Sequence, residues 1–532
     1  MKEVEFNLLE EPWIRVLCPD SSVQEVSLTQ ALLQAHEYTD LAGELPTQDV
    51  AVLRLLLAVL HAVFGRVDMD GQPVEITNTT TAVCQWKSLW KLGKLPEKPI
   101  RDYLAKWHDR FWLFHPRRPF WQVPEAKIGI DFDAQKLNGE VSQSGNTARL
   151  FASYSGTEKE SVSYAAAARW LLYINGYDER GGRPKAGNKP RPGVAWLGQI
   201  GFVAVKGKTL YETLMKNFVL LQDGEKTFTE PNPIWEQVDV KSEQSTEIPM
   251  PTDAAQMLTL QSRRIILKRE KGRVIGHILV GGDFIQPDNA FAEQMTIWKN
   301  YTKNGLTIYS PRLHDTTKQM WREFPTLFEG REPGVVRWNV LLQLKGAIPR
   351  RQPIVLWGVA NQYDSQGASV KDAYSDTLSF HLALVSELGY KQSMVIDEIH
   401  RCEKLATAVG RLASDLAKAA GSHADAKTDA VEQFYFQIDV PFRQWLYSID
   451  PDWDGEQSNA SRASWRNRAQ RIARDLGRNL VEQSGPAAFI GRSIDGKEKN
   501  KQETQKLYYA APKAYNVFLA RVHEIYQEEG GA

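Results

Sequence analysis

The segment Asp364-Ser365-Gln366-Gly367 carries small polar side chains that could enter a groove of DNA or separate one base pair. It follows the apolar run Ile354-Val355-Leu356-Trp357, which is typical of a buried strand. Gly367 permits a tight turn, and the amide of Gln366 offers hydrogen-bond donors and an acceptor. The alternative interpretation is an ordinary solvated turn, because such residues are common in turns of any function.

A second segment, residues 177–193, combines glycines with basic side chains. The glycines Gly181, Gly182 and Gly187 allow a backbone to approach a ligand closely. Five basic residues face only two acidic ones, Asp178 and Glu179; they are Arg180, Arg183, Lys185, Lys189 and Arg191. This mixture suits contact with phosphates or with the minor groove, whereas the alternative is a flexible solvated loop.

Two other groups of residues could also contact nucleic acid. Arg149 and Phe151 pair a cation with a flat ring, which can hold a phosphate beside a base or sugar, although Phe151 could equally anchor a loop in the core. Six arginines within residues 462–478 cover the polar side of an expected helix: Arg462, Arg466, Arg468, Arg471, Arg474 and Arg478. This row is a solvated helix face, a guide for displaced single-stranded DNA or a surface that pairs with neighbouring protein subunits.

The residue types needed for catalysis are not grouped in a recognisable motif. The pairs His108-Asp109 and His314-Asp315 lack the further ligands that a metal-dependent nuclease needs, so we expect structural or surface roles for them. The chain has no phosphate-binding loop, no nucleophile elbow and no His-Glu-x-x-His motif. We therefore expect no enzyme activity, no cofactor and no bound metal.

Composition limits the remaining possibilities. A chain of 532 residues is too long for one compact hydrophobic core, so we expect two or more domains. The 65 basic residues balance 65 acidic ones, which argues against a protein that binds nucleic acid by itself through a large net positive charge. Three separated cysteines, Cys18, Cys84 and Cys402, indicate a reducing, cytoplasmic setting. The longest apolar run, residues 51–64, is interrupted by Arg54 and His61 and is too short for a bilayer, so no membrane is expected as a partner.

The elements that must position these residues differ along the chain. Residues 4–26 predict a hairpin around a turn at 19–22, and Ser27 with Gln30 has the spacing of a capping box that starts a helix. Residues 274–280 predict a strand, and residues 295–301 a short helix. The long loop region at 115–160 is of a length that is uncommon unless it serves a function or is disordered.

The last third of the chain has a different pattern. Apolar residues recur at intervals of three and four in four sets: Leu405 to Ala419, Val431 to Ile438, Trp465 to Leu480, and Leu507 to Phe518. Four amphipathic helices with short links predict an antiparallel four-helix bundle. We therefore expect an α+β protein with a mixed N-terminal domain at 1–375, carrying long loops, and a bundle at 376–532.

Segments spread over nearly the whole chain are similar to the CasA family, the large subunit of the type I-E CRISPR surveillance complex (Cascade). They occur in the family's order: 6–16 (FNLLEEPWIRV), 118–122 (RPFWQ), 145–151 (GNTARLF), 166–171 (AAARWL), 196–201 (WLGQIG) and the Ser365-Gln366 tip. Each segment is short, but their number and order make a chance likeness improbable. The Cys-rich zinc-type motif that some relatives carry is not found in this sequence.

The resemblance implies roles for particular residues. Gln366, with Ser365 and Gly367, corresponds to the wedge that separates the first target base pair beside the protospacer-adjacent motif (PAM). The glycine-containing loop that approaches the PAM minor groove falls at Gly181, Gly182, Arg183 and Lys185. A PAM-proximal lysine falls near Gln294, with Lys299 as the second choice. A loop that touches the crRNA end and nearby DNA falls at Asn146, Thr147, Arg149 and Phe151.

The leading hypothesis is therefore a non-catalytic subunit that reads the PAM, starts unwinding and recruits a helicase-nuclease. Its implied partners are crRNA, double-stranded target DNA, the other Cascade subunits and that effector, and Arg466, Arg471, Arg474 and Arg478 could guide a strand. Two alternatives remain. Sixteen tryptophans could serve a carbohydrate-active or carbohydrate-binding protein, and the chain could be a structural scaffold.

Overall fold

A computed structural model of the chain describes residues 3–138, 157–180, 193–237, 245–328, 331–386, 389–422, 425–496 and 505–527. The chain forms two compact units. The N-terminal unit comprises residues 1–349 and 354–377, and the C-terminal unit comprises residues 350–353 and 378–532. The division falls inside strand β15 (Val370–His381), which also contains the predicted boundary at residue 375.

The first elements follow the local sequence signals. Strands β2 (Ile14–Leu17) and β3 (Val23–Val26) pair antiparallel around the predicted turn, and β4 (Asp40–Leu41) pairs with the other edge of β2. Helix α1 (Leu28–Leu33) begins at Ser27, whose hydroxyl accepts from the Gln30 N–H while the Gln30 side chain accepts from the Ser27 N–H. The hairpin and the capping box are both confirmed.

The core of the N-terminal unit is built around helix α2 (Pro46–Phe64). This helix packs against α7 (Tyr164–Tyr177) and α9 (Ala254–Leu258). By length and composition α2 could cross a membrane, but 94% of its apolar stretch is buried inside the protein, which makes it a core helix of this unit. A helix that is apolar on all sides is stable in water only when it is covered in this way.

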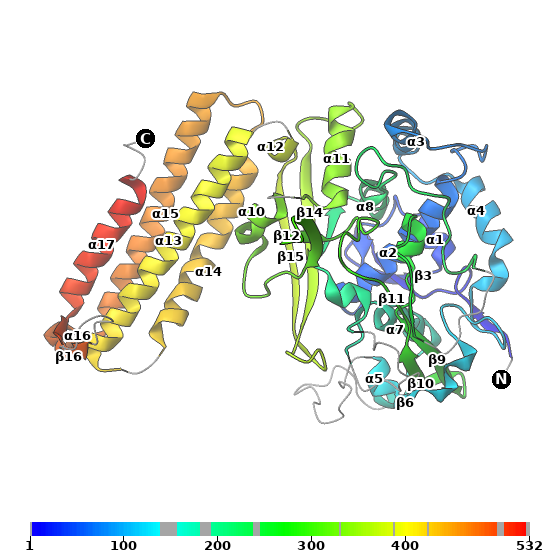
Figure 1. The fold of residues 1–532 in the computed structure, drawn as a ribbon, viewed down its shortest axis with the longest axis horizontal. Coiled ribbons are helices and arrows are strands. Elements are labelled where there is room, and N and C mark those ends of the chain that lie inside the picture. The colour runs from blue at the N-terminus through cyan, green and yellow to red at the C-terminus, as the bar shows by residue number, and fades with distance from the viewer. Residues whose placement is uncertain are drawn as a thin grey trace. The chain divides into compact units, whose positions relative to one another are not determined.

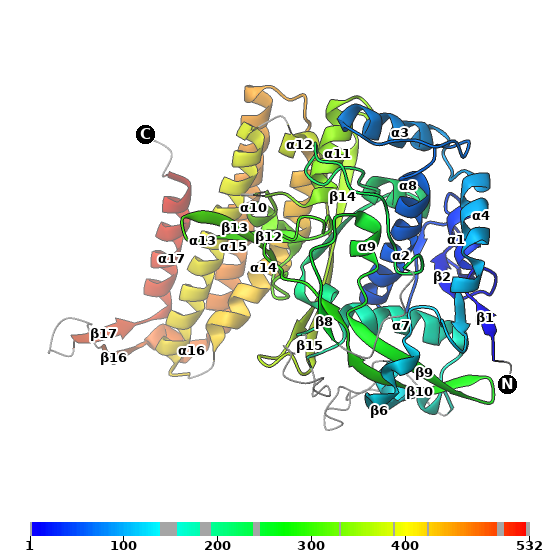
Figure 2. The ribbon, with the colours of Figure 1, turned by 45° about the vertical axis from the view of Figure 1, so that its right-hand side comes forward.

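Two sheets of the N-terminal unit support the candidate site. One contains β6 (Ile130–Asp133), β10 (Arg273–Gly281) and β9 (Arg263–Glu270), with β10 antiparallel to both neighbours; Figure 2 shows β9 and β10 as a long hairpin. The predicted strand at 274–280 is thus confirmed. The other contains β15, β14 (Pro353–Tyr363) and β7 (Phe202–Lys206) in that order.

The remaining elements complete this unit. The helices are α3 (Thr79–Lys91), α4 (Glu97–Lys106), α5 (Ala134–Leu137), α6 (Thr157–Glu160), α8 (Leu210–Asn217), α10 (Phe324–Phe328) and α11 (Gly334–Leu344). The short 3-10 helices are η1 (His108–Arg110), η2 (Pro124–Ile128), η3 (Trp196–Gln199) and η4 (Met320–Glu323). The strands are β1 (Glu5–Asn7), β5 (Trp112–Phe114), β8 (Thr246–Glu247), β11 (Asp283–Phe284), β12 (Ile297–Lys303) and β13 (Leu306–Arg312).

The predicted helix at residues 295–301 is wrong. These residues enter strand β12, which forms a hairpin with β13 around Asn304 and Gly305, both of which have positive φ. Only Ile297 and Trp298 of β12 are buried, and the residues from Lys299 onward are exposed. Pairing with β13, whose residues lie up to fifteen positions away, determined the strand conformation of β12.

The C-terminal unit contains the predicted bundle. Helices α13 (Gly389–Ala420), α14 (Ala426–Ser448), α15 (Gly455–Gln483) and α17 (Ala511–Gln527) pack along one another (Figure 1). The expected apolar positions, such as Leu412, Phe434 and Trp465, are buried. The fourth helix begins later than predicted, because Leu507 lies in β17 (Gln505–Tyr509), which pairs with β16 (Arg492–Gly496). Two short helices complete the unit: α12 (Ala383–Ser386) precedes α13, and α16 (Gly485–Ile490) lies between α15 and β16.

Candidate nucleic-acid interface

Residues 364–369 form the tip between β14 and β15, and Asp364 organises this tip. Its backbone N–H donates to the Ser369 carbonyl at 3.0 Å, and its carbonyl accepts from the Gly367 N–H at 2.9 Å. The Asp364 Oδ1 atom accepts from the N–H groups of Gln366 and Ala368 at 2.9 and 2.8 Å. These backbone hydrogen bonds, the one from Ala368 first, lower the pKa of the Asp364 carboxyl below its usual value.

The side chains of Ser365 and Gln366 remain outside this turn. Both residues are exposed, and neither side chain forms a hydrogen bond with the described residues. The polar backbone of the tip is therefore satisfied from within, while the amide of Gln366 keeps its donors and its acceptor for another molecule. This arrangement is what a residue needs if it must enter a base stack without loosening its own loop.

Gly367 brings the tip against the flanks of the glycine-rich basic segment. Its φ is +71°, and its carbonyl accepts from the Arg180 N–H at 2.7 Å. A Cβ atom on Gly367 would lie 3.1 Å from both Arg180 Cβ and Val194 Cγ2. Arg180 and Val194 flank residues 181–193, so the tip lies against both flanks of that segment. Both the conformation and the spacing favour glycine at this position.

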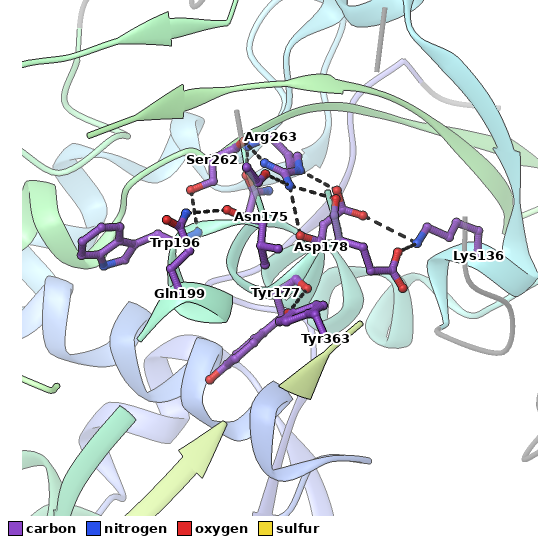
Figure 3. A network of polar contacts seen from close by, with 12 residues as sticks. Lys136, Asn175, Tyr177, Asp178, Trp196, Gln199, Ser262, Arg263 and Tyr363 are labelled. Carbon is purple, nitrogen blue, oxygen red and sulfur yellow. Dashed lines mark hydrogen bonds and ion pairs between the residues drawn. The ribbon is translucent and has the colours of Figure 1, made fainter. Parts of the chain in front are cut away.

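One buried guanidinium, that of Arg263, holds both flanks of the same segment (Figure 3). Its Nε donates to Asp178 Oδ2 at 2.5 Å. Its Nη2 contacts the carbonyls of Asp178 and Glu179 before the segment, at 3.0 and 3.1 Å, and that of Gly193 after it, at 2.9 Å. Arg263 is the first residue of β9, so the β6-β10-β9 sheet is joined through it to both flanks of the segment.

Lys136 and Tyr363 complete the support beneath the tip (Figure 3). The Lys136 ammonium pairs with Glu179 and lies 3.6 Å from Asp178 Oδ1. Tyr363, the last residue of β14, donates its hydroxyl to the Tyr177 carbonyl at 2.6 Å, and burial raises its pKa well above the usual value. Burial lowers the pKa of Arg263 to about 10, which leaves the guanidinium charged near neutral pH.

Several predicted site residues lie outside the described residues. They are Gly181, Gly182, Arg183 and Lys185 of the glycine-rich segment and Asn146, Thr147, Arg149 and Phe151 of the earlier loop. Their predicted contacts stay predictions. The described flank at Arg180 is nevertheless in contact with the tip, so two of the segments singled out in the sequence meet at one place.

Gln294 and Lys299 have opposite environments. The Gln294 side chain is buried, and its Nε2 donates to the carbonyls of Phe291 and Gln222 at 2.6 and 3.2 Å. It therefore has a structural role here, and we do not retain it as a DNA contact. Lys299 is exposed on β12 and remains the candidate of the pair.

The arginines of α15 divide in a similar way. Arg466 is not on the open face: its Nε donates to Glu398 Oε1 at 2.8 Å, and Glu398 is fully buried in the bundle. Arg471, Arg474 and Arg478 are exposed. The strand-guidance prediction is therefore corrected for Arg466, because a guanidinium committed to a buried carboxylate is not available to a phosphate.

The two His-Asp pairs are tied into the fold. His314 is buried and bonds the Glu323 carboxylate at 3.1 Å and the Phe202 carbonyl at 2.9 Å. His108 contacts Glu10 at 3.0 Å. No cluster of metal-binding side chains occurs among the residues that the structure describes.

Sequence reasoning missed Arg263, Lys136 and the anchoring role of Asp178 and Glu179. The two acidic residues were counted as charges opposing the basic loop, whereas they are buried partners at its base. The signal that could have found Arg263 is its position, because Arg263-Arg264 leads directly into the apolar run Ile265-Ile266-Leu267. Charges at the start of a buried strand need internal partners.

Comparison with known proteins gives a consistent result. The family model described as CRISPR-associated protein Cse1 matches residues 7–476. A protein of Thermus thermophilus, named CRISPR-associated protein CasA/Cse1, is 35% identical over 240 residues, which are 43% of this chain and 42% of that protein. The matched stretch thus spans less than half of the Thermus protein.

Solved structures extend the likeness over the whole chain. The crystal structure of Thermobifida fusca Cse1 has a TM-score of 0.80 and 28% identity, and the match covers 98% of each chain. A chain of a structure titled CRISPR RNA-guided surveillance complex has a TM-score of 0.62 at 17% identity, over 90% of this chain and 98% of that one. At that identity the second likeness concerns the fold alone.

Proposed function

Because this chain belongs to the CRISPR-associated protein Cse1 family, we propose that it recognises a PAM in duplex DNA and begins to unwind the target there. The family makes it a subunit of the type I-E surveillance complex, Cascade, in antiviral defence. In this proposal the subunit performs no catalysis and works in the cytoplasm. Pairing with crRNA reads the target sequence, while this chain reads the PAM through the minor groove.

The observation that carries the proposal is the exposed Gln366 amide on a tip fixed from below. Asp364 satisfies the backbone of the tip, and Gly367 joins it to the flank of the basic segment through Arg180. A wedge must be both free at its end and rigid at its base. The tip has these two properties, and the Arg263 contacts supply the rigid base.

The energetic demand on such a wedge is modest. Unstacking one base step costs roughly a few kcal/mol. The RNA–DNA hybrid that forms is about as stable as the DNA duplex that it replaces, so a local contact can tip the balance. A single inserted amide held in position is therefore enough to favour opening at one place, and it need not supply the energy of the whole R-loop.

Other residues would complete the interface. We propose that Gly181, Gly182, Arg183, Lys185 and Lys299 contact the PAM duplex, and that Asn146, Thr147, Arg149 and Phe151 contact crRNA and adjacent DNA. The exposed Arg471, Arg474 and Arg478 would follow the displaced strand. Recruitment of a helicase-nuclease belongs to the same proposal. A carbohydrate-binding role is not retained, because the family assignment offers no support for it.

The experiment replaces Gln366 by Ala in the assembled complex and measures binding of PAM-containing duplex DNA. We expect affinity for the closed duplex to fall by about tenfold or more, since each 1.4 kcal/mol changes an equilibrium tenfold. The same variant should bind almost normally when the first base pairs beside the PAM are mismatched, because the opening step is then already made.

The matched control is Gln362→Ala, which changes an exposed glutamine on β14 four residues earlier. It should leave both affinities unchanged. If the complex assembled with Gln366→Ala binds closed and mismatched duplexes as the unaltered complex does, the chain is a scaffold and the wedge proposal fails. A loss that mismatches do not restore would assign Gln366 to groove contact instead of base-pair opening.

A further inference from the structure

A cavity on the N-terminal unit, near the end of β5, has a wall of three arginines: Arg110, Arg117 and Arg118. Aromatic and amide side chains form most of the rest of its lining, chiefly Phe120, Trp121, Gln122, Trp235, Gln237 and Gln261. Among the residues that the structure describes, no aspartate or glutamate lines the cavity. It is separate from the tip, and the proposed wedge does not use any of these residues.

The three guanidinium groups lack an ionic partner within the described part of the chain. Among the described residues none of them forms an ion pair, and the one side-chain hydrogen bond is from Arg110 Nη2 to the Gln237 carbonyl at 3.2 Å. By contrast, the exposed Arg101 on α4 pairs with Glu97 at 2.6 Å. Unpaired arginines that share a cavity leave an excess of positive charge there.

His115 shows that these charges converge. Its Nδ1 accepts from the backbone N–H groups of Arg117 and Arg118 at 3.2 and 2.9 Å, so the ring is fixed inside the turn that carries both arginines. Burial lowers the pKa of His115, and Arg117, Arg118 and Arg110 lower it further, opposed by Asp109. The pKa of Arg110 is likewise lowered by burial and then by Arg118. Bringing these cations together is unfavourable until an anion joins them.

Two of the lining side chains favour a ligand that accepts hydrogen bonds. Trp121 is buried with φ of +53°, and its indole N–H has no hydrogen-bond partner among the described residues. The acceptor of the neighbouring Gln122 is already used, because its Oε1 accepts from the Leu267 N–H at 2.9 Å. A ligand that matches this lining must therefore supply negative charge and acceptor oxygens.

The volume of the cavity limits the size of the ligand that it can bind. It has about 50 Å³ open to the centres of water-sized groups, whereas one water needs roughly 10–15 Å³ on that measure. A drug-sized ligand needs on the order of 300 Å³. The cavity thus accepts a group of a few atoms, and the flat rings beside it offer a surface for an attached sugar or base.

We propose that this cavity binds a phosphate group, with Arg117 and Arg118 as its main donors and Arg110 behind them. Guanidinium groups match phosphate oxygens in geometry as well as charge. The phosphate could belong to a nucleic-acid backbone or to a small phosphate-bearing ligand. Only the nucleic-acid source rests on the proposed function, whereas the anion chemistry stands independently of it.

The test uses the full chain with the double substitution Arg117→Ala/Arg118→Ala. Three probes are titrated: inorganic pyrophosphate by calorimetry, and a short single-stranded RNA and a duplex DNA without a PAM by fluorescence anisotropy at several NaCl concentrations. We expect at least one probe to bind about tenfold more weakly. For a nucleic acid, the slope of log K against log salt should fall by about 0.7–0.9 for each lost phosphate contact. The melting temperature should not change, because neither side chain has a hydrogen-bond or ionic partner among the described residues.

The matched control is Lys98→Ala/Arg101→Ala, which removes two exposed cations from α4 in the same unit. A selective loss for RNA or DNA assigns the phosphate to that backbone, and a loss confined to pyrophosphate assigns it to a small ligand. Unchanged binding of all three probes, or equal losses in the control, overturns the proposal. The wedge proposal has its own test, the binding of mismatched duplex DNA by the Gln366→Ala complex. A negative result at the arginine cavity would not change the expected outcome of that test, so the two proposals can fail independently.

Discussion

Both units of this chain bury a cluster of charges, but they use it in opposite ways. In the N-terminal unit one arginine, Arg263, is shared by several acceptors from two stretches of backbone. In the bundle one carboxylate, Glu398, is shared by three arginines: Arg401, Arg462 and Arg466. The first cluster holds the two flanks of the glycine-rich segment, whereas the second joins α13 to α15. A buried charge cluster thus supports the proposed site in the N-terminal unit and helix packing in the bundle.

The largest expected effect comes from Arg263→Met. Removing one member of a buried ion pair leaves Asp178 poorly compensated, which typically costs about 3–5 kcal/mol. The free energy of unfolding of the N-terminal unit, measured by urea denaturation, should fall by that amount. Hydrogen exchange should accelerate at the Arg180 and Ala195 amides, which donate to Gly367 and Asp178.

The control for this change is Arg264→Met. Arg264 is equally buried, and among the described residues it pairs with Asp283 at 2.5 Å and donates to the Gln261 carbonyl at 3.1 Å, not to the flanks of the glycine-rich segment. It should destabilise the unit without selectively accelerating exchange at Arg180. Equally fast hydrogen exchange at the Arg180 amide in the two variants would contradict the conclusion that Arg263 holds the flanks of the glycine-rich segment. The contrast with the Glu398 cluster of the bundle would then no longer hold.

Glu398→Gln tests the charge cluster that is buried in the bundle. The amide keeps an acceptor but loses the charge that three guanidinium groups share, and hydrogen bonds to charged groups contribute roughly 1.5–3 kcal/mol. We expect a loss in this range, confined to the unfolding of the bundle, with exchange at the tip unchanged. Asp397→Asn is the matched control: its side chain is 52% exposed and pairs only at the surface with Arg462, so a loss below about 1 kcal/mol is expected.

The smallest effect is expected at Asp364, where the carboxylate is not enclosed by the fold. Its pKa is lowered by the tip N–H groups, so its contribution is present above the ordinary carboxyl value of 3.8 and is lost as pH falls through the lower folded value. Asp364→Asn keeps an oxygen acceptor and should therefore only loosen the tip. Exchange at the Ala368 amide should be faster in the variant near neutral pH, and the difference should shrink in acid. A difference that persists at low pH would show that charge is not responsible.

Charge positions were the part of the fold that local sequence predicted least well. Six arginines on one helix face were read as a single row, yet Arg462 and Arg466 turn toward Glu398 while Arg471 remains exposed. Gln294 was placed near DNA and lies buried against backbone carbonyls. Glu398 lies 64 and 68 residues from the two arginines, and one of the two carbonyls that hold Gln294, that of Gln222, lies 72 residues away. No local pattern indicates partners at such separations.

The sequence by itself determined the elements whose partners are near neighbours. The capping box at Ser27, the turn after β2, the four bundle helices and the polar tip at Asp364 depend on contacts within a few positions, which spacing reveals. The resemblance of short ordered segments also indicated the family. These inferences needed no knowledge of how distant parts of the chain meet.

Only the tertiary structure decided which of these elements share a site. The contact of Arg263 with Asp178 spans 85 residues, and no periodicity of 2 or 3.6 carries that information. The same limit explains why residues 297–303 became a strand: the partner strand, not local propensity, satisfied their backbone. Pairing between distant segments depends on how the whole unit buries its apolar residues. The sequence therefore predicted the turn at residues 364–369, but only the tertiary structure showed that this turn contacts Arg180 at the flank of the glycine-rich segment.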